Sequence, residues 1–531
     1  SDVVAGIIVA IIALPLSIAL ALASGVGPEQ GIYTAIAAGF VISFLGGSQV
    51  QIAGPTAAFA TIVAGIVAKS GVEGLAVATI MAGIILVIMG FCHFGSLIKF
   101  IPFTITTGFT SGIAVTIVIG QLKDFFGVTY PAGMETIETM QKLKAFAAGF
   151  GSVNLHAIIV GVVCLAILIV MPMITEKIPG SLVAVIAGIL MVKFLPLHVN
   201  TIGDLYTVSN KLPAFRLPVF SYDVIQGSLS DAFTIAVLAA IESLLSCVVA
   251  DGMIGGKHRS NTELVAQGAG NIISALFGGI PATGAIARTA ANVKNGGRTP
   301  VAGMVHALTL LLILLFLMPY ASLIPMTCLA SILMIVGYNM SGWRTVVRMI
   351  QRAPKSDVAV LIVTFILTVF FDLVVAIEFG MVLAAFLFLK RMSDVAQIRQ
   401  WVDKENLDDP VLSEDSDLKQ VPKNAVVYEI FGALFFGAAN NFLNVINDDG
   451  KNVLILRMRN VPAMDISGLD ALEETLAICQ KRGMTLLLSH VNAQPYRVLE
   501  KSGFIQTIGP DNICESTDQA LEKAVALAKE G

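Results

Sequence analysis

The chain has 531 residues, of which 56% are hydrophobic and 13% are charged, and its formal net charge is −4. A soluble domain has about 45–50% apolar and about 25% charged residues, so most of this chain is predicted to lie in a lipid bilayer. The small net charge gives no reason to expect a nucleic-acid partner. The six cysteines form no Cys-x-x-Cys pair, which argues against a disulfide framework or a zinc site.

Apolar segments follow one another from the first residue to about residue 391, which defines a predicted transmembrane domain. A helix that crosses the hydrocarbon layer needs about 20 apolar residues, and several segments are shorter than that. With the last and longest segment counted as two helices broken near Asp372, the pattern predicts about fourteen helices. The segments are residues 3–23, 31–45, 55–68, 75–94, 106–122, 157–174, 182–195, 232–250, 264–277, 284–293, 301–318, 330–338 and 358–388.

The distribution of Lys and Arg gives the orientation of these helices. Loops after even-numbered helices hold more Lys and Arg than the others, including the cluster Arg344, Arg348, Arg352 and Lys355. The positive-inside rule places these loops in the cytoplasm. An even number of helices then puts both termini in the cytoplasm, so we expect a multi-pass protein of the inner (cytoplasmic) membrane.

Two short segments, residues 51–58 and 278–285, each combine Gly, Pro and Thr just before a helix that is too short to cross the bilayer. They occupy corresponding places in two predicted seven-helix halves, residues 1–195 and 225–391. Irregular backbone at membrane depth is tolerated where it lines a cavity, and helix N-termini bind anions. The pair therefore predicts a transporter binding site between the halves. The alternative is two surface turns.

Glu242 lies in the middle of the apolar segment 232–250. A charged side chain there costs about 2.5–3.5 kcal/mol, so it is a functional candidate by default. Ser246 lies one turn further on the same helix face. The two could hold Na⁺ through their oxygens, or Glu242 could carry a proton. Alternatively, the carboxyl group is structural and bonds a neighbouring helix.

Arg288 lies about one turn into the second short helix. It could add positive charge to an anion site or pair with a carboxylate such as Glu242. It could also extend toward the cytoplasmic surface.

The composition changes after residue 391. Residues 392–423 form an acidic predicted linker, and residues 424–531 read as a small soluble α/β domain. Strands are predicted at 424–431, 452–458 and 485–488, and helices at 469–482 and 517–529. Ser467 lies at a strand-to-helix junction, where it either caps the helix or serves in regulation.

No metalloprotease, nucleophile-elbow, phosphate-loop or dinucleotide motif is present in the sequence, so an enzyme is not expected. Three functions remain: a secondary-active symporter for a small anion, an uncoupled anion channel or exchanger, and a membrane receptor that senses anions. A membrane carboxylate beside a predicted anion site favours coupled transport.

The sequence resembles the bacterial SulP-family (solute carrier family 26) anion transporters with a C-terminal STAS domain. The stretches that match are residues 13–19, 31–35, 51–56, 240–246, 249–252, 278–289, 298–303, 352–357 and 465–469. The resemblance implies an α-helical membrane protein with fourteen transmembrane helices in two inverted seven-helix repeats, which form a core and a gate domain. It also implies a homodimer and an elevator-like alternating-access movement.

The resemblance also implies a set of site residues. The substrate-binding residues on the two sides and on the first helix are Thr56, Ala57, Ala58, Gly284, Ala285, Ile286, Ala287 and Leu20. Sodium-coupled bicarbonate members have an Asp and a Thr at the positions of Glu242 and Ser246. This departure favours H⁺ over Na⁺ as the coupling ion. We therefore expect a proton symporter for dicarboxylate, bicarbonate or sulfate, without a cofactor. A sodium-coupled bicarbonate symporter and an uncoupled exchanger are the alternatives.

Overall fold

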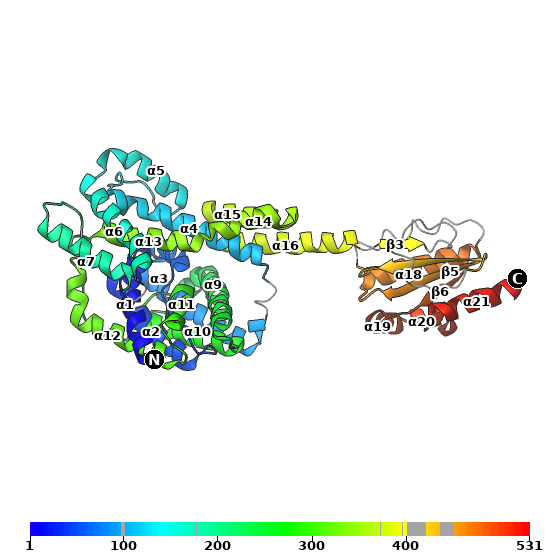
Figure 1. Ribbon diagram of the computed structural model, residues 1–531. Helices are drawn as coiled ribbons and strands as arrows, with labels where there is room; N and C mark the ends of the chain where they lie inside the picture. The colour runs from blue at the N-terminus through cyan, green and yellow to red at the C-terminus, as the bar shows by residue number, and fades with distance from the viewer. Residues whose placement is uncertain are drawn as a thin grey trace. The chain divides into compact units, whose positions relative to one another are not determined.

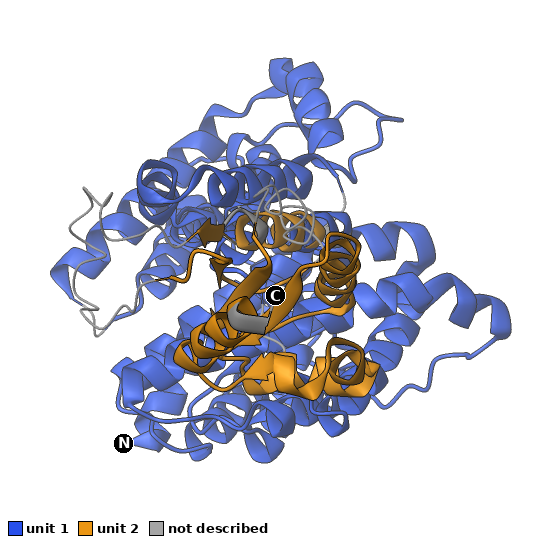
Figure 2. Ribbon diagram, turned by 90° about the vertical axis from the view of Figure 1, so that its right-hand side faces the viewer, with its two compact units in different colours: residues 1–381 blue, residues 382–531 orange. Residues whose placement is uncertain are grey.

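The computed structural model describes residues 1–96, 101–175, 178–371, 373–395, 397–400, 421–435 and 451–530. The chain forms two units, residues 1–381 and 382–531 (Figure 2). The first unit is helical apart from two very short strands, and the second contains a five-stranded sheet.

The first half of the helical unit begins with two helices and a two-residue strand before its longest helix. Its elements are α1 (Asp2–Ala23), α2 (Pro28–Leu45), β1 (Ala53–Gly54), α3 (Ala57–Phe91), α4 (Phe103–Phe126), α5 (Thr139–Gly149), α6 (Leu155–Ile174), α7 (Gly180–Phe194) and α8 (Ile202–Leu205). The second half repeats this order, including the two-residue strand. Its elements are α9 (Tyr222–Ile254), α10 (Ser260–Leu276), β2 (Thr283–Gly284), α11 (Ile286–Lys294), α12 (Val301–Ala321), α13 (Met326–Ser341), α14 (Trp343–Arg352), α15 (Lys355–Phe370) and α16 (Leu373–Val395).

Most of these helices are apolar around their whole circumference, which is typical of helices in a membrane. Among the described residues, seven helical stretches are long and apolar enough to cross a bilayer. α3 is two helices in one label, because Gly71 at φ 69° breaks it between the predicted segments 55–68 and 75–94. The last predicted segment also forms two helices, α15 and α16, and Asp372 between them lies outside the described residues. The count of fourteen spans remains a prediction.

The packing of the two halves is symmetric. Three contacts join an element to its counterpart in the other half: α2 with α10, α4 with α13, and β1 with β2. Several other contacts come in matching pairs, such as α1 with α12 and α9 with α3, or α15 with α4 and α6 with α13. This pattern is the one that two related repeats produce. α11, which lies among α1, α9 and α10 in Figure 1, is the counterpart of the first part of α3.

The second unit is built on a sheet in the order β3-β4-β5-β6-β7. β4 to β7 are parallel, and β3 joins β4 antiparallel. The bounds are β3 (Gln397–Gln400), β4 (Ala425–Phe431), β5 (Val453–Asn460), β6 (Thr485–Ser489), β7 (Ile513–Cys514), α18 (Ile466–Lys481), α19 (Ala493–Ser502), α20 (Phe504–Ile508) and α21 (Thr517–Glu530). The three predicted strands and two predicted helices of this domain are confirmed. β3 falls inside the stretch that composition marks as a linker, of which residues 401–420 lie outside the described residues.

The explanation of Ser467 as a helix cap is wrong. α18 begins at Ile466, so Ser467 lies inside its first turn, and the N-cap is Asp465. The Asp465 carboxylate accepts a hydrogen bond of 2.9 Å from the Gly468 N–H, which satisfies one of the free donors at the helix start. A regulatory role of Ser467 stays a prediction.

Candidate functional site

The two predicted helix starts meet at a pair of two-residue strands. β1 and β2 are antiparallel, with Ala53 opposite Gly284 and Gly54 opposite Thr283. The Ala285 N–H extends this pairing with a 2.9 Å hydrogen bond to the Ile52 carbonyl. Because the strands are antiparallel and each leads into a helix, α3 and α11 start close together and leave in opposite directions. The sequence motifs predicted the meeting place, but two residues are too few to show a strand periodicity.

A cavity of about 120 Å³ lies at these helix starts. The residues that line it are Leu16, Leu20, Pro55, Thr56, Ala57, Glu242, Gly284, Ala285, Ile286, Ala287, Arg288, Val336 and Met340. The first N–H groups of a helix have no partner inside the helix, so both helix starts offer donors and partial positive charge to this cavity.

Most of the predicted site residues therefore lie together, and two do not. Ala58 is fully buried and does not line the cavity. Ser246 is also fully buried and does not line it. Three apolar residues that the sequence analysis missed, Leu16, Val336 and Met340, complete the wall. Nothing in the sequence distinguishes them from other apolar residues of α1 and α13.

Glu242 presents its carboxylate to the start of α3. The Thr56 hydroxyl donates a 2.9 Å hydrogen bond to Glu242 Oε2. Thr56 is the N-cap of α3, but its side chain makes no capping bond to its own helix. The hydroxyl thus links α9 to the helix start, and the carboxylate borders the cavity.

Ser246, one turn further along α9, points to a different place. Its hydroxyl donates to Thr289 Oγ1 at 3.3 Å, and the same oxygen accepts the Ile52 N–H at 3.0 Å. Thr289 therefore fastens α9, α11 and the residue before β1 to one another. The predicted pair of Glu242 and Ser246 does not present its two oxygens to the same cavity.

Arg288 is buried, with an exposed fraction of only 2%, so it does not extend to the surface. Its Nη2 donates a 3.0 Å hydrogen bond to the Pro55 carbonyl in the other half. Nε and Nη1 have no hydrogen-bond partner among the described residues. No ion pair joins Arg288 to Glu242 in this part of the chain either. The cavity therefore combines a guanidinium that has unused donors with a carboxylate on α9.

Close packing holds the strand pair in place. Gln51 is buried, and its Oε1 contacts the Cys247 thiol. A Cβ atom at Gly284 would overlap with the Gln51 side chain, and one at Gly54 would meet Arg288 Nη1. Both positions require glycine because a neighbouring side chain occupies the space.

Three polar side chains of α10 form hydrogen bonds with the backbone near the two short strands. Glu263, Gln267 and Asn271 are four residues apart and fully buried. Glu263 Oε2 accepts the N–H groups of Gly47 and Ser48 at 2.9 and 3.1 Å. Asn271 bonds both the N–H and the carbonyl of Ala282, at 2.8 and 2.9 Å. These bonds satisfy irregular backbone near both strands, as burial requires. Gln267 and Asn271 fall within the predicted apolar segment 264–277 and Glu263 lies just before it, so the sequence prediction gave these three residues no role.

Comparison with known proteins agrees with this architecture. The sulfate permease family model matches residues 1–364, and the STAS domain model matches residues 417–520. The chain is 39% identical to the putative sulfate transporter YvdB of Bacillus subtilis, over 98% of this chain and 96% of that protein. It is 31% identical to the bicarbonate transporter BicA of a Picosynechococcus species, over 99% of this chain and 94% of that protein.

Two solved structures have the same fold. The transmembrane domain of a cyanobacterial bicarbonate transporter BicA matches with a TM-score of 0.63 and 30% identity, covering 72% of this chain and 96% of that one. The murine Solute Carrier 26 family member A9 anion transporter, in the inward-facing state, matches with a TM-score of 0.87 over 99% and 91% of the two chains. Its identity of 18% supports the fold only. The chain is a multi-pass membrane transporter that belongs to the sulfate permease family and carries a C-terminal STAS domain.

Proposed function

We propose that the protein is a secondary-active symporter that carries a small oxyanion together with a proton. One observation carries the anion part: Arg288 lines the cavity, and its buried guanidinium has two nitrogens, Nε and Nη1, without a hydrogen-bond partner among the described residues. A buried donor that stays unsatisfied costs about 1–3 kcal/mol or more, so a ligand with acceptor oxygens gains that energy on binding. The N-termini of α3 and α11 add positive electrostatic potential at the same cavity.

Sulfate, bicarbonate and a small dicarboxylate share the chemistry that this site offers. Each presents several acceptor oxygens and negative charge to N–H donors. The small side chains of Ala57, Ala285 and Ala287 leave room beside the helix starts. The similarity to a putative sulfate transporter and to a bicarbonate transporter supports this class of substrate without choosing within it.

Glu242 supports coupling to protons. An ionised carboxylate that borders the cavity repels an anion, and its protonation removes the repulsion. Anion and proton then favour each other's binding by the same factor, since such coupling is reciprocal. Ser246 is engaged with Thr289 outside the cavity, so the oxygen pair expected of a sodium site is not presented there.

Elevator-like movement is the form of alternating access that we propose. The strand pair and the helices that follow it pack with α1, α2, α9 and α10, whereas Val336 and Met340 reach the cavity from α13, which packs with α4 and α6. A site between two such helix groups suits the sliding of one group along the other. We place both termini and the STAS domain in the cytoplasm, as the Lys and Arg distribution predicts.

Uptake into proteoliposomes tests the proposal. Radiolabelled sulfate, bicarbonate and fumarate would be offered with an inward proton gradient, an inward sodium gradient or neither, to wild type and Glu242→Gln. Glutamine keeps an acceptor for Thr56 but cannot ionise. The matched control is Asp231→Asn, on the same helix, whose carboxylate lies 3.7 Å from the Lys69 ammonium.

We expect concentrative uptake of one anion with the proton gradient, lost in Glu242→Gln and kept in Asp231→Asn. Uptake that follows sodium alone would instead establish a sodium symporter. Flux that ignores both gradients and survives the Glu242 change would identify an exchanger or channel and refute proton coupling.

A further inference from the structure

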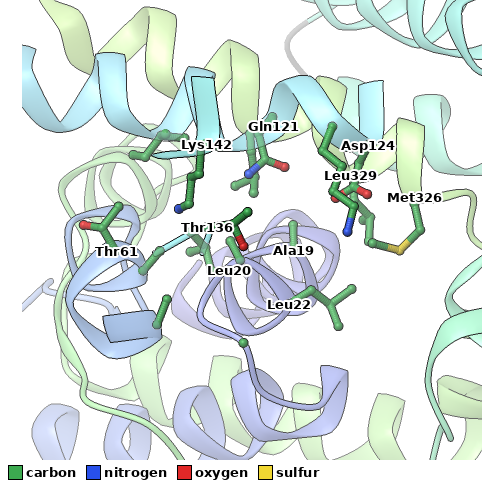
Figure 3. Close-up of a pocket in the computed structure, with 18 of the residues that line it drawn as sticks. Ala19, Leu20, Leu22, Thr61, Gln121, Asp124, Thr136, Lys142, Met326 and Leu329 are labelled. Carbon is green, nitrogen blue, oxygen red and sulfur yellow. The ribbon is translucent and has the colours of Figure 1, made fainter. Parts of the chain in front are cut away.

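A second cavity, of about 350 Å³, has the wall residue Leu20 in common with the candidate site; Figure 3 shows this second cavity. Leu20 is 2% exposed and lines both cavities. On α13, Leu329 and Leu333 line the second cavity, and Val336 and Met340, further along the same helix, line the site. The two cavities therefore follow one another along α1 and α13, with Leu20 between them.

Lys142 of α5 enters this second cavity. Figure 3 shows its side chain extending between Thr61 and Thr136. Its Nζ lies against α4, 3.9 Å from the position that a Cβ atom at Gly120 would take. No ion pair to a carboxylate involves Lys142 within the described ranges. Burial lowers the pKa of its ammonium group, and no neighbouring carboxylate opposes this effect.

The other lysines of this region have charged or aromatic partners. Lys69, on the wall of an adjoining cavity of about 510 Å³, pairs with Asp231 at 3.7 Å. Lys123 lies 5.2 Å from the centre of the Tyr130 ring and interacts electrostatically with Asp124. Lys142 lines both of these cavities, and the carboxylates at their walls are Asp124, Glu138 and Asp231.

Residues with hydroxyl and amide groups line these cavities together with Lys142. Thr61 and Thr116 line both cavities with it, and Gln121 and Thr136 line the second cavity. Thr116 and Gln121 are buried, at 6% and 8% exposure. The charged residues at the wall of the second cavity are Lys123, Lys142 and Asp124, which leaves one positive charge in excess. Lys142 is half-buried and has no ion pair among the described residues, so an anion that enters here is stabilised by the charge of its ammonium group.

We propose that Lys142, with Thr61, Gln121 and Thr136, forms a second anion-binding site, where an oxyanion is held before it passes Leu20 to the helix starts. This inference rests on the proposed function for its direction of use, but not for the binding itself. The ammonium supplies a point charge, and the hydroxyl and amide groups supply donors to the anion's oxygens. Such a site raises the local anion concentration, and salt weakens its effect.

Uptake kinetics of the full-length protein distinguish an effect of Lys142 on anion binding, which changes KM, from an effect on the transport rate, which changes kcat. Initial uptake of radiolabelled sulfate and bicarbonate would be measured at low and high ionic strength for wild type, Lys142→Met and Lys142→Arg. The matched control is Lys69→Gln, which removes the same charge from a lysine that is already paired. For Lys142→Met we expect a KM raised roughly three- to tenfold at low salt, a kcat within about twofold and a smaller KM effect at high salt. Lys142→Arg should restore most of the affinity.

Three kinetic results would overturn the inference. They are an unchanged KM in Lys142→Met, an equal rise in Lys69→Gln, and a fall in kcat at constant KM. An unchanged KM would mean that Lys142 does not help to bind the anion. An equal rise in Lys69→Gln would mean that only the net charge of the region matters. A fall in kcat at constant KM would indicate a structural role of Lys142.

Equilibrium binding distinguishes a failure of this inference from a failure of the proposed function. Sulfate and bicarbonate binding to the detergent-solubilised full chain would be measured for Arg288→Gln and for Arg288→Gln with Lys142→Met. Weak, salt-sensitive binding that survives the first change and is lost in the second supports the second site, even if no variant transports the anion. Binding that is identical in the two variants refutes it, even if wild type is a symporter.

Discussion

The starts of α3 and α11 follow the same plan but differ in charge. A two-residue strand precedes each helix, and the two strands pair with each other. At α3 the polar group is Thr56, whose hydroxyl donates to a carboxylate that belongs to α9. At α11 the N-cap is Ala285, which has no polar side chain, and the polar groups are Arg288 and Thr289 of its own first turn.

This difference separates two tasks within one small cavity. The α11 side supplies a fixed positive charge, because a guanidinium stays protonated under ordinary conditions. The α3 side borders Glu242, a carboxylate that can gain and lose a proton. In the symport proposed above, a repeated fold thus provides one side that holds the anion and one side that responds to protons. Substitutions on each side of the cavity test this division of roles.

Gly284→Ala should damage both sides at once. The added Cβ overlaps with the Gln51 side chain beside the strand pair. Overpacking of this kind costs about 1–3 kcal/mol, and here it would also separate the strands. We expect uptake to fall to background, with a lower melting temperature in detergent. The control is Gly65→Ala, where a Cβ meets nothing within 4 Å. Normal uptake by Gly284→Ala would show that the strand pair does not set the site.

Arg288→Gln should weaken anion binding without changing the response to protons. The substitution removes the charge and the unused donors, and a hydrogen bond to a charged group contributes about 1.5–3 kcal/mol. We expect the dissociation constant of the transported anion to rise roughly 10- to 100-fold. The control is Arg298→Gln, since the Arg298 side chain bonds the carbonyls of Val293 and Gly297 instead. Equal affinities in wild type and Arg288→Gln would contradict the assignment of the two sides.

Thr56→Val and Thr289→Val compare the two threonines directly. Thr56 donates to Glu242, which favours the ionised carboxylate, so its loss should move the midpoint of the pH–uptake curve upward by up to about one pH unit. Thr289 bonds Ile52 and Ser246 instead, so its loss should lower stability by about 1–2 kcal/mol and leave the midpoint in place. Measured pH profiles and melting temperatures test both, and reversed effects would refute the division.

Ile286→Ala should have the smallest effect, on selectivity. Ile286 is 41% exposed at the cavity and is the bulkiest of the residues before Arg288 on α11. Its truncation enlarges the cavity, so fumarate uptake relative to sulfate should rise a few-fold. Competition assays would show it. A ratio that does not change would mean that other walls limit the size of the anion.

Much of this site could be predicted because it uses residue types that are unusual within apolar segments. Gly, Pro and Thr before a short helix revealed both helix starts, and a charge within an apolar segment revealed Glu242 and Arg288. Strand and helix periodicity was sufficient for β4, β5, β6, α18 and α21 of the STAS domain.

The parts that the sequence analysis missed depend on three-dimensional contact. Two residues are too few to show the alternation of apolar and polar side chains that is typical of a strand, so β1 and β2 could not be predicted. Val336 and Met340 line the cavity only because α13 crosses it, and their residue types fit any buried helix. The cap is Asp465 and not Ser467, because α18 begins three residues before the predicted helix start at residue 469.

The hydrogen bonds between β1 and β2 have a consequence for the direction of flux. They fix the starts of α3 and α11 to each other, so these two parts of the wall keep their spacing during the movement proposed above. The anion should then have nearly the same dissociation constant from either side of the membrane. A carrier with equal affinities on both faces has no built-in preference for import or export. In the proposed symport the gradients of anion and proton, together with the membrane potential, set the direction of flux, and equal affinities let the carrier work equally well in both directions.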